Sequence, residues 1–120
     1  MVIVEIPTKL PSLNDYINEC RRNRYAAGKM KQDVENEIGY YLRNLKPFHY
    51  PIKIHFHWIE GNKRRDFDNI SSGGRKFILD ALVKFEKLPD DNRRYVRGFT
   101  DTFEYGDEFK VILEIEEVRE

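Results

Sequence analysis

The sequence predicts an α+β domain, a mixed β-sheet with helices packed on one face. Residues alternate between apolar and polar in four stretches, which is typical of strands, and two stretches with helical spacing lie between them. The predicted order is therefore β-α-β-α-β-β. A chain of 120 residues can bury a core of its own, so we expect residues 1–120 to form a single domain.

Four segments are predicted to be strands from their alternation and from the turn residues around them. The first covers residues 2–6, and the second covers about 51–60. The last two cover about 95–105 and 109–117. Because a short polar turn at Gly106-Asp107 separates these two, we expect them to pair as a hairpin.

Two segments are predicted to be amphipathic helices. The first runs over about 29–44 and should end before Pro47. The second runs over about 75–87, and Pro89 forbids its continuation. Before the first helix, Pro11-Ser12-Leu13-Asn14 has the composition of a turn or a helix cap.

The composition favours a protein of a reducing compartment. Cys20 is the only cysteine, which excludes an internal disulfide and a cysteine-based zinc site within one chain. No stretch approaches the roughly 18 apolar residues that a membrane span requires. We therefore expect a cytoplasmic protein with no membrane partner.

The charge is unevenly distributed, although the formal net charge is zero. The last 23 residues hold two basic and eight acidic side chains, so the 97 residues before them hold nineteen basic and thirteen acidic ones, a net charge of +6. Such an imbalance can form a phosphate-facing side or simply a solvated charged surface. The basic residues gather in four clusters: Arg21-Arg22-Arg24, Lys63-Arg64-Arg65, Arg75-Lys76 and Arg93-Arg94-Arg97.

Clustered carboxylates beside cations are the strongest chemical signal. Asp66 and Asp68 directly follow a predicted strand, and in extended backbone they would project to one side with Cα atoms about 6.5–7 Å apart. Asp91, returned by the following helix, is a plausible third ligand for Mg²⁺, which takes a few carboxylates together with waters and phosphate oxygens. The alternative is a solvated charged loop.

Lys76 is the natural cationic partner of these carboxylates. Its ammonium group could neutralise charge on a phosphate or assist a leaving group. Lys76 also lies four residues before Asp80 on the predicted helix, a spacing that equally favours an ordinary salt bridge.

Four short motifs occur in an order that resembles the RusA family of Holliday-junction endodeoxyribonucleases. They are the early P-S-x-N turn at residues 11–14, Arg65-Asp66-Phe67-Asp68-Asn69, Lys76-x-x-x-Asp80-Ala81-Leu82, and Leu88-Pro89-Asp90-Asp91. The resemblance covers nearly the whole chain. It implies a homodimer, bacterial or phage-encoded, that makes paired nicks in four-way or other branched DNA during recombination and repair.

The resemblance also implies roles for particular residues. Asp66, Asp68 and Asp91 would bind Mg²⁺, for which Mn²⁺ can substitute, and together with Lys76 they would form the catalytic set. The predicted DNA contacts are Lys63, Arg64, Arg65, Arg75 and Asn14.

One departure concerns the spacing of the lysine. In the family it lies four residues after the second aspartate, whereas Lys76 lies eight after Asp68, with four extra residues in the region 71–75. Two glycines there would permit positive φ, so the extra residues can bulge outward and leave Lys76 in place, or they can displace it. Displacement would favour a second function, a RusA-fold protein that binds branched DNA but cuts it poorly or not at all.

Other residues suggest rival readings. His55 and His57 share one side of a predicted strand and could hold a transition metal, although ordinary sheet residues explain them as well, and Trp58 should be in the core. The segment from Arg21 to Tyr25 is either a DNA-gripping segment or an exposed loop. A third function, hydrolysis of small phosphorylated substrates, would require a deep closed pocket.

Overall fold

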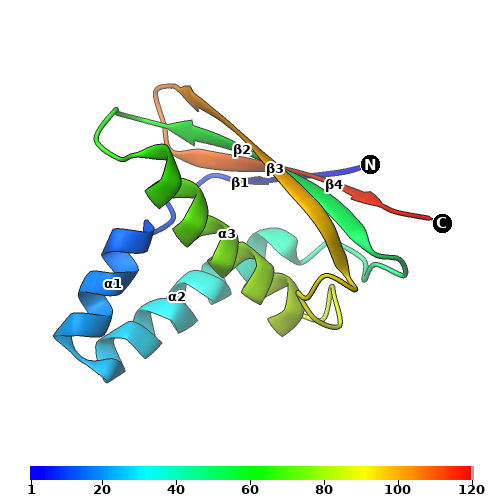
Figure 1. The fold of residues 1–120 in the computed structure, drawn as a ribbon, viewed down its shortest axis with the longest axis horizontal. Helices are drawn as coiled ribbons and strands as arrows, with labels where there is room; N and C mark the ends of the chain where they lie inside the picture. Colours follow the sequence, from blue (N-terminus) through cyan, green and yellow to red (C-terminus); the bar gives the residue numbers. More distant parts are fainter. Residues whose placement is uncertain (120) are drawn as a thin grey trace.

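The computed structural model describes residues 1–119 and confirms the predicted α+β class, with one helix more than expected. Figure 1 shows a twisted sheet with the helices gathered on one of its faces. The elements in chain order are β1 (Val2–Ile6), α1 (Leu13–Arg22), α2 (Arg24–Leu42), β2 (Ile52–Glu60), α3 (Phe67–Lys84), β3 (Val96–Tyr105) and β4 (Lys110–Glu117).

The sheet has the order β1-β4-β2-β3. Strand β4 pairs antiparallel with both β1 and β2, while β2 and β3 are parallel and are connected through α3. Helix α3 is therefore the crossover of a β-α-β unit, which places it against the face of the sheet beside β2 and β3 (Figure 1).

The predicted hairpin of the last two strands is wrong. Strands β3 and β4 are not neighbours, because β2 lies between them. The reason lies in their burial: Val111, Leu113 and Ile115 of β4 are at most 1% exposed, so this strand takes a central position, whereas β3 is half exposed along its length and forms an edge. Alternation identified both strands but does not determine which strand pairs with which.

Helix α1 was not predicted. Ser12 is its N-cap, and a reciprocal capping box joins the Ser12 hydroxyl to the Asp15 amide and the Asp15 carboxylate to the Ser12 amide. Asn23 ends α1 and caps α2 with its side chain, so α2 begins at Arg24 rather than near residue 29. The expected turn or cap at residues 11–14 is thus confirmed as a helix cap.

Helix α3 begins at Phe67, well before the predicted start near residue 75. Residues 71–75 are helical, and no glycine of the described chain has positive φ. The extra residues therefore extend the helix, and the expectation that they could bulge outward is wrong.

The two glycines of this region serve close packing. A Cβ on Gly73 would lie 2.5 Å from the Leu13 amide nitrogen and 2.5 Å from the Ser12 carbonyl carbon. A Cβ on Gly74 would lie 2.5 Å from the ring of Trp58. Helix α3 thus touches the first turn of α1 and the sheet at positions where no side chain fits.

The core lies between the sheet and the helices. Its largest fully buried side chains come from every layer: Phe56, Ile6, Ile38, Leu42, Ile52, Ile54, Ile70, Ile78, Leu82, Leu113, Ile115 and Val111. Trp58 is 3% exposed, as predicted. Among residues 1–119, no helix combines the length and the apolar character needed to cross a membrane.

We expect Gly73→Ala to lower the free energy of unfolding by about 1 to 3 kcal/mol, because the new methyl group meets backbone that cannot move aside cheaply. The matched control is Gly28→Ala in α2, where nothing lies within 4 Å of the added Cβ. There alanine should raise the free energy of unfolding by about 0.5 to 1 kcal/mol through helix propensity. Urea unfolding measures both, and equal effects of the two changes would contradict the proposed contact.

Candidate functional site

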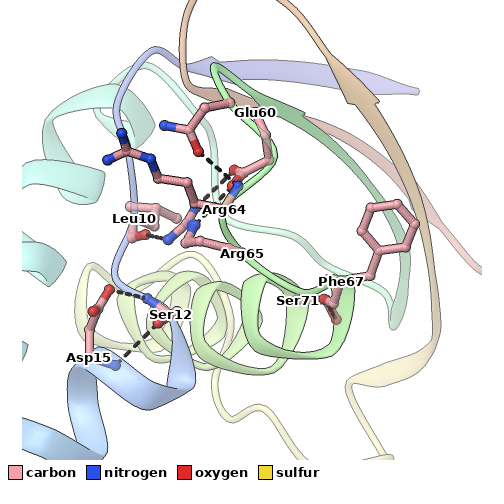
Figure 2. A network of polar contacts seen from close by, with 9 residues as sticks. Leu10, Ser12, Asp15, Glu60, Arg64, Arg65, Phe67 and Ser71 are labelled. Carbon is pink, nitrogen blue, oxygen red and sulfur yellow. Dashed lines mark hydrogen bonds and ion pairs between the residues drawn. The ribbon is translucent and has the colours of Figure 1, made fainter.

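The loop between β2 and α3 is held by a nearly buried ion pair between Glu60 and Arg65 (Figure 2). The Nε and Nη2 groups of Arg65 each donate to a Glu60 oxygen at 2.8 Å, and Nη1 donates to the Leu10 carbonyl at 2.7 Å. The side chains of Arg65 and Glu60 are 13% and 5% exposed. Three segments are thereby joined: the end of β2, the start of α3 and the chain before α1.

Two of the five predicted DNA contacts, Arg65 and Arg75, form ion pairs within the protein, with Glu60 and Asp101. The sequence placed Arg65 among them, but its guanidinium donors bind groups inside the protein. Lys63 and Arg64 are exposed on the same loop. Asn14 is also exposed, in the first turn of α1.

Asp66 and Asp68 lie at the start of α3. Asp66 is the N-cap, yet its side chain makes no capping hydrogen bond, and Asp68 follows in the first turn. Both side chains are exposed and have no hydrogen-bond or ion-pair partner among residues 1–119. Because α3 starts at Phe67, the motif is not the extended segment that the sequence predicted, but both carboxylates remain free to bind a ligand.

Asp91 lies near the opposite end of α3. Partial burial and the nearby charge of Asp80 raise the pKa of the Asp91 carboxyl above its usual 3.8. Asp80 is twelve residues beyond Asp68 on one helix, which corresponds to about 18 Å along its axis. The structure therefore brings Asp91 together with Asp80 and Asp90, not with Asp66 and Asp68.

Lys76 forms the salt bridge with Asp80 that their spacing of four residues on one helix allows. Its Nζ lies 3.5 Å from a carboxylate oxygen of Asp80, and Lys31 of α2 lies 3.4 Å from the same oxygen. Lys76 is also about 12 Å beyond Asp68 along the helix axis. In this single chain it is oriented toward Asp80, away from the two free carboxylates.

Of the three predicted metal ligands, Asp66 and Asp68 lie at the same end of α3, apart from Asp91. Residues 1–119 contain no group of three or more histidine, cysteine, aspartate or glutamate side chains that could hold a metal ion. Mg²⁺ is commonly bound by one or two carboxylates, with waters and substrate phosphates as its other ligands. Asp66 and Asp68 could each supply an oxygen to that open type of site, because both residues are exposed and their side chains have no partner among residues 1–119.

The two histidines of β2 are engaged by the neighbouring strand β3. The ring nitrogens of His55 contact the hydroxyl groups of Thr100 and Thr102, the second at 2.9 Å. His57 contacts Thr102 at 3.2 Å and the Glu104 carboxylate at 3.2 Å. These contacts occupy the ring nitrogens that a transition metal would need.

The basic segment between the N-terminal turn and the first predicted helix is itself helical. Arg21 and Arg22 end α1, and Arg24 begins α2. Tyr25 beside them is 82% exposed. The segment is thus an exposed, cation-rich corner between two helices.

Sequence reasoning missed a row of aromatic side chains beside Asp66 and Asp68, which we call the aromatic stripe: Phe67, Phe99, Phe103 and Tyr105. Phe67 is the residue between the two aspartates, and the other three lie on one side of β3, with Asp101 between Phe99 and Phe103. The signal that could have revealed the stripe was the spacing of these aromatic residues by two and four along one predicted strand, which places them on the same side.

Loss of one partner from the buried ion pair of Arg65 and Glu60 should strongly lower stability. Arg65→Gln should lower the free energy of unfolding by about 3 to 5 kcal/mol, because it leaves Glu60 buried without its charge partner. Arg64→Gln, on an exposed neighbour, should have little effect. Adding Glu60→Gln to the Arg65 variant should recover part of the loss, and urea unfolding of the three variants tests this.

Lys31 of α2 lies between two carboxylates, those of Glu35 and Asp80. Burial alone would lower its pKa, but the charges of Asp80 and Glu35 outweigh burial and raise the pKa above 10.5. A raised lysine pKa contributes stability below pH 10.5, and that contribution is lost as the pH rises through the folded-state pKa.

Lys31→Gln should therefore lower stability at pH 7, and the difference from wild type should shrink above pH 10.5. The side chain is 39% exposed, so we expect an effect below about 1 kcal/mol. Lys29→Gln removes a more exposed ion pair with Asp33 on the same helix and serves as the control. A difference that persisted unchanged at high pH would contradict the electrostatic origin.

Comparison with known proteins does not assign a family. No family model matches the sequence, and a search of curated proteins finds no significantly similar one. The site is therefore interpreted from its own residues and geometry.

Proposed function

We propose that this protein is a RusA-like, divalent-metal-dependent endonuclease that cuts four-way or other branched DNA. The observation that supports this best is the state of Asp66 and Asp68, two exposed carboxylates without partners, directly after a loop with the exposed cations Lys63 and Arg64. Carboxylates without partners beside cations suit a site that recruits both a metal ion and a phosphate.

In this proposal, the side chains at the start of α3 have separate tasks. Asp66 and Asp68 hold Mg²⁺ or Mn²⁺, which when bound supplies activation of water and stabilisation of the leaving oxygen. Lys63 and Arg64 attract the DNA backbone, and the free amides of the first turn of α3 add positive potential there. Recombination or repair of DNA is the proposed setting, which implies a cytoplasmic protein.

The proposed working form is a homodimer. A four-way junction has near two-fold symmetry, so two related sites can cut opposing strands. Asp91 and Lys76 belong to the proposed catalytic set through the family pattern alone, since Lys76 is paired with Asp80 and Asp91 lies close enough to Asp80 to feel its charge.

A second candidate function is binding of branched DNA without efficient cleavage. It is favoured by the ion pair between Lys76 and Asp80 and by the helical separation of both from Asp68. A protein of this kind would bind junctions with a strong dependence on salt and leave them intact.

Incubation of a labelled four-way junction with the protein and Mg²⁺ or Mn²⁺ tests the proposed nuclease. Wild type should produce paired nicks, whereas Asp68→Asn should bind the junction but lose nearly all nicking. Asp33→Asn, an exposed aspartate of α2, is the matched control and should cut normally. If wild type binds the junction tightly but leaves it uncut with both Mg²⁺ and Mn²⁺, the nuclease proposal is refuted and the second candidate function is supported.

Lys76→Gln and Asp91→Asn then test the remaining family roles. If Lys76 acts only in its ion pair with Asp80, the glutamine variant should cut at a rate close to wild type. A loss of cutting with unchanged junction binding would instead assign Lys76 to the reaction. Asp91→Asn is compared with wild type in the same way. Cutting close to the wild-type rate would place Asp91 outside the reaction, whereas a loss of cutting with unchanged junction binding would assign it to the reaction.

A further inference from the structure

The aromatic stripe is unusual because its rings remain exposed in a chain with ample core to bury them. Phe67, Phe99 and Tyr105 are 48%, 50% and 46% exposed, and Phe103 is partly buried. Strand β3 is an edge of the sheet, so no strand within the described chain covers its outer side. Exposed side chains of this size that lie together indicate a binding surface.

The rings form one line because of how β3 and α3 are placed. Phe99, Phe103 and Tyr105 pair in register with Ile54, Trp58 and Glu60, the residues of β2 that face the helices. From Phe99 to Tyr105 the strand extends by about 20 Å. The stripe therefore follows the helix-facing side of the edge strand, and Figure 1 shows α3 crossing that face of the sheet.

Phe67 joins this line from the helix. Its ring stacks on Phe103 with centroids 4.2 Å apart and planes 8° from parallel. Figure 2 shows the Phe67 side chain pointing away from the ion pair of Arg65 and Glu60, on the far side of the loop. The stripe thus reaches the residue that separates the two free carboxylates.

Cations lie over two of the rings. The Arg75 guanidinium is 4.5 Å from the centroid of Phe99 and is fixed by an ion pair with Asp101. The Lys63 ammonium is 5.1 Å from the centroid of Tyr105. The charge of Arg75 is balanced by Asp101, which lies between Phe99 and Phe103 on the same side of β3. Lys63 is therefore the cation beside the stripe that can attract a negatively charged partner with flat apolar faces.

We propose that the aromatic stripe binds single-stranded DNA by stacking on unpaired nucleobases. The DNA strand that reaches Asp66 and Asp68 would then be single-stranded where it crosses the stripe. The inference rests on the proposed action on branched DNA and deepens it by naming the part of the substrate that is recognised. Bases inside a duplex have both faces covered by their neighbours, whereas unpaired bases offer free faces to aromatic rings. Branched DNA supplies such bases where its arms meet.

The test measures binding of a fluorescently labelled oligothymidylate, and of the same strand annealed to its complement, with EDTA present so that no cleavage occurs. Wild type should bind the single strand more tightly than the duplex. Phe67→Leu and Phe99→Leu should each weaken single-strand binding about tenfold, since stacking on one ring contributes roughly that much. Leucine keeps most of the apolar volume but removes the flat face.

Tyr40→Leu is the matched control, because Tyr40 is 58% exposed, has Arg43 over its ring at 4.0 Å and lies on α2 outside the stripe. A strand with 2-aminopurine gives a second readout: stacking on a ring should quench its fluorescence in wild type and in the control, and less so in the two phenylalanine variants. Unfolding midpoints of all variants show whether each remains folded at the assay temperature.

Three results would overturn the inference. The first is equal single-strand binding by wild type and both phenylalanine variants, and the second is no preference for the single strand over the duplex. The third is a wild-type dimer, detected by sedimentation, that Phe99→Leu converts to monomers without changing DNA binding. The nuclease assay is independent of these measurements. Quenching of 2-aminopurine without cleavage of the junction would refute the proposed nuclease but support base stacking on the stripe. Cleavage of the junction without quenching would support the nuclease and refute base stacking.

Discussion

The ion pair between Glu60 and Arg65 is the interaction on which the arrangement of the candidate site depends. It lies at the end of a central strand, where a carboxylate 5% exposed is tolerated only because a guanidinium bonds to both of its oxygens. The Nη1 group of Arg65 donates a hydrogen bond to the Leu10 carbonyl, so the same guanidinium also fixes the chain before α1. The start of α3, with its two carboxylates, is positioned from there.

Close contact between helices provides the second constraint. Gly73 lets the first turn of α1 touch the backbone of α3, and the capping box of Ser12 and Asp15 keeps that turn in shape. Both constraints act on the same end of α3. The result is a rigid platform under exposed acidic, basic and aromatic side chains, which is what a site needs when its ligand must be held in one geometry.

The sequence was sufficient for the strands and for the class of the fold, because alternation with period two reports burial directly. It was insufficient for strand order, since β3 and β4 alternate alike and only their relative burial decides which one is central. Helix α1 was missed because it is short, only ten residues, and buries none of them completely, so its few apolar residues were not taken as a helical face. Of the predicted ligands, Asp66 and Asp68 are adjacent through the chain itself, whereas the position of Asp91 depends on the length of α3.

The continuous course of α3 through residues 71–75 has a geometric consequence. Each residue of an uninterrupted helix adds about 1.5 Å along the axis and about 100° around it. Lys76, eight residues after Asp68, therefore lies about 12 Å farther along α3 and about 80° around it. A rigid helix thus keeps the ammonium group of Lys76 apart from the Asp68 carboxylate in both position and direction.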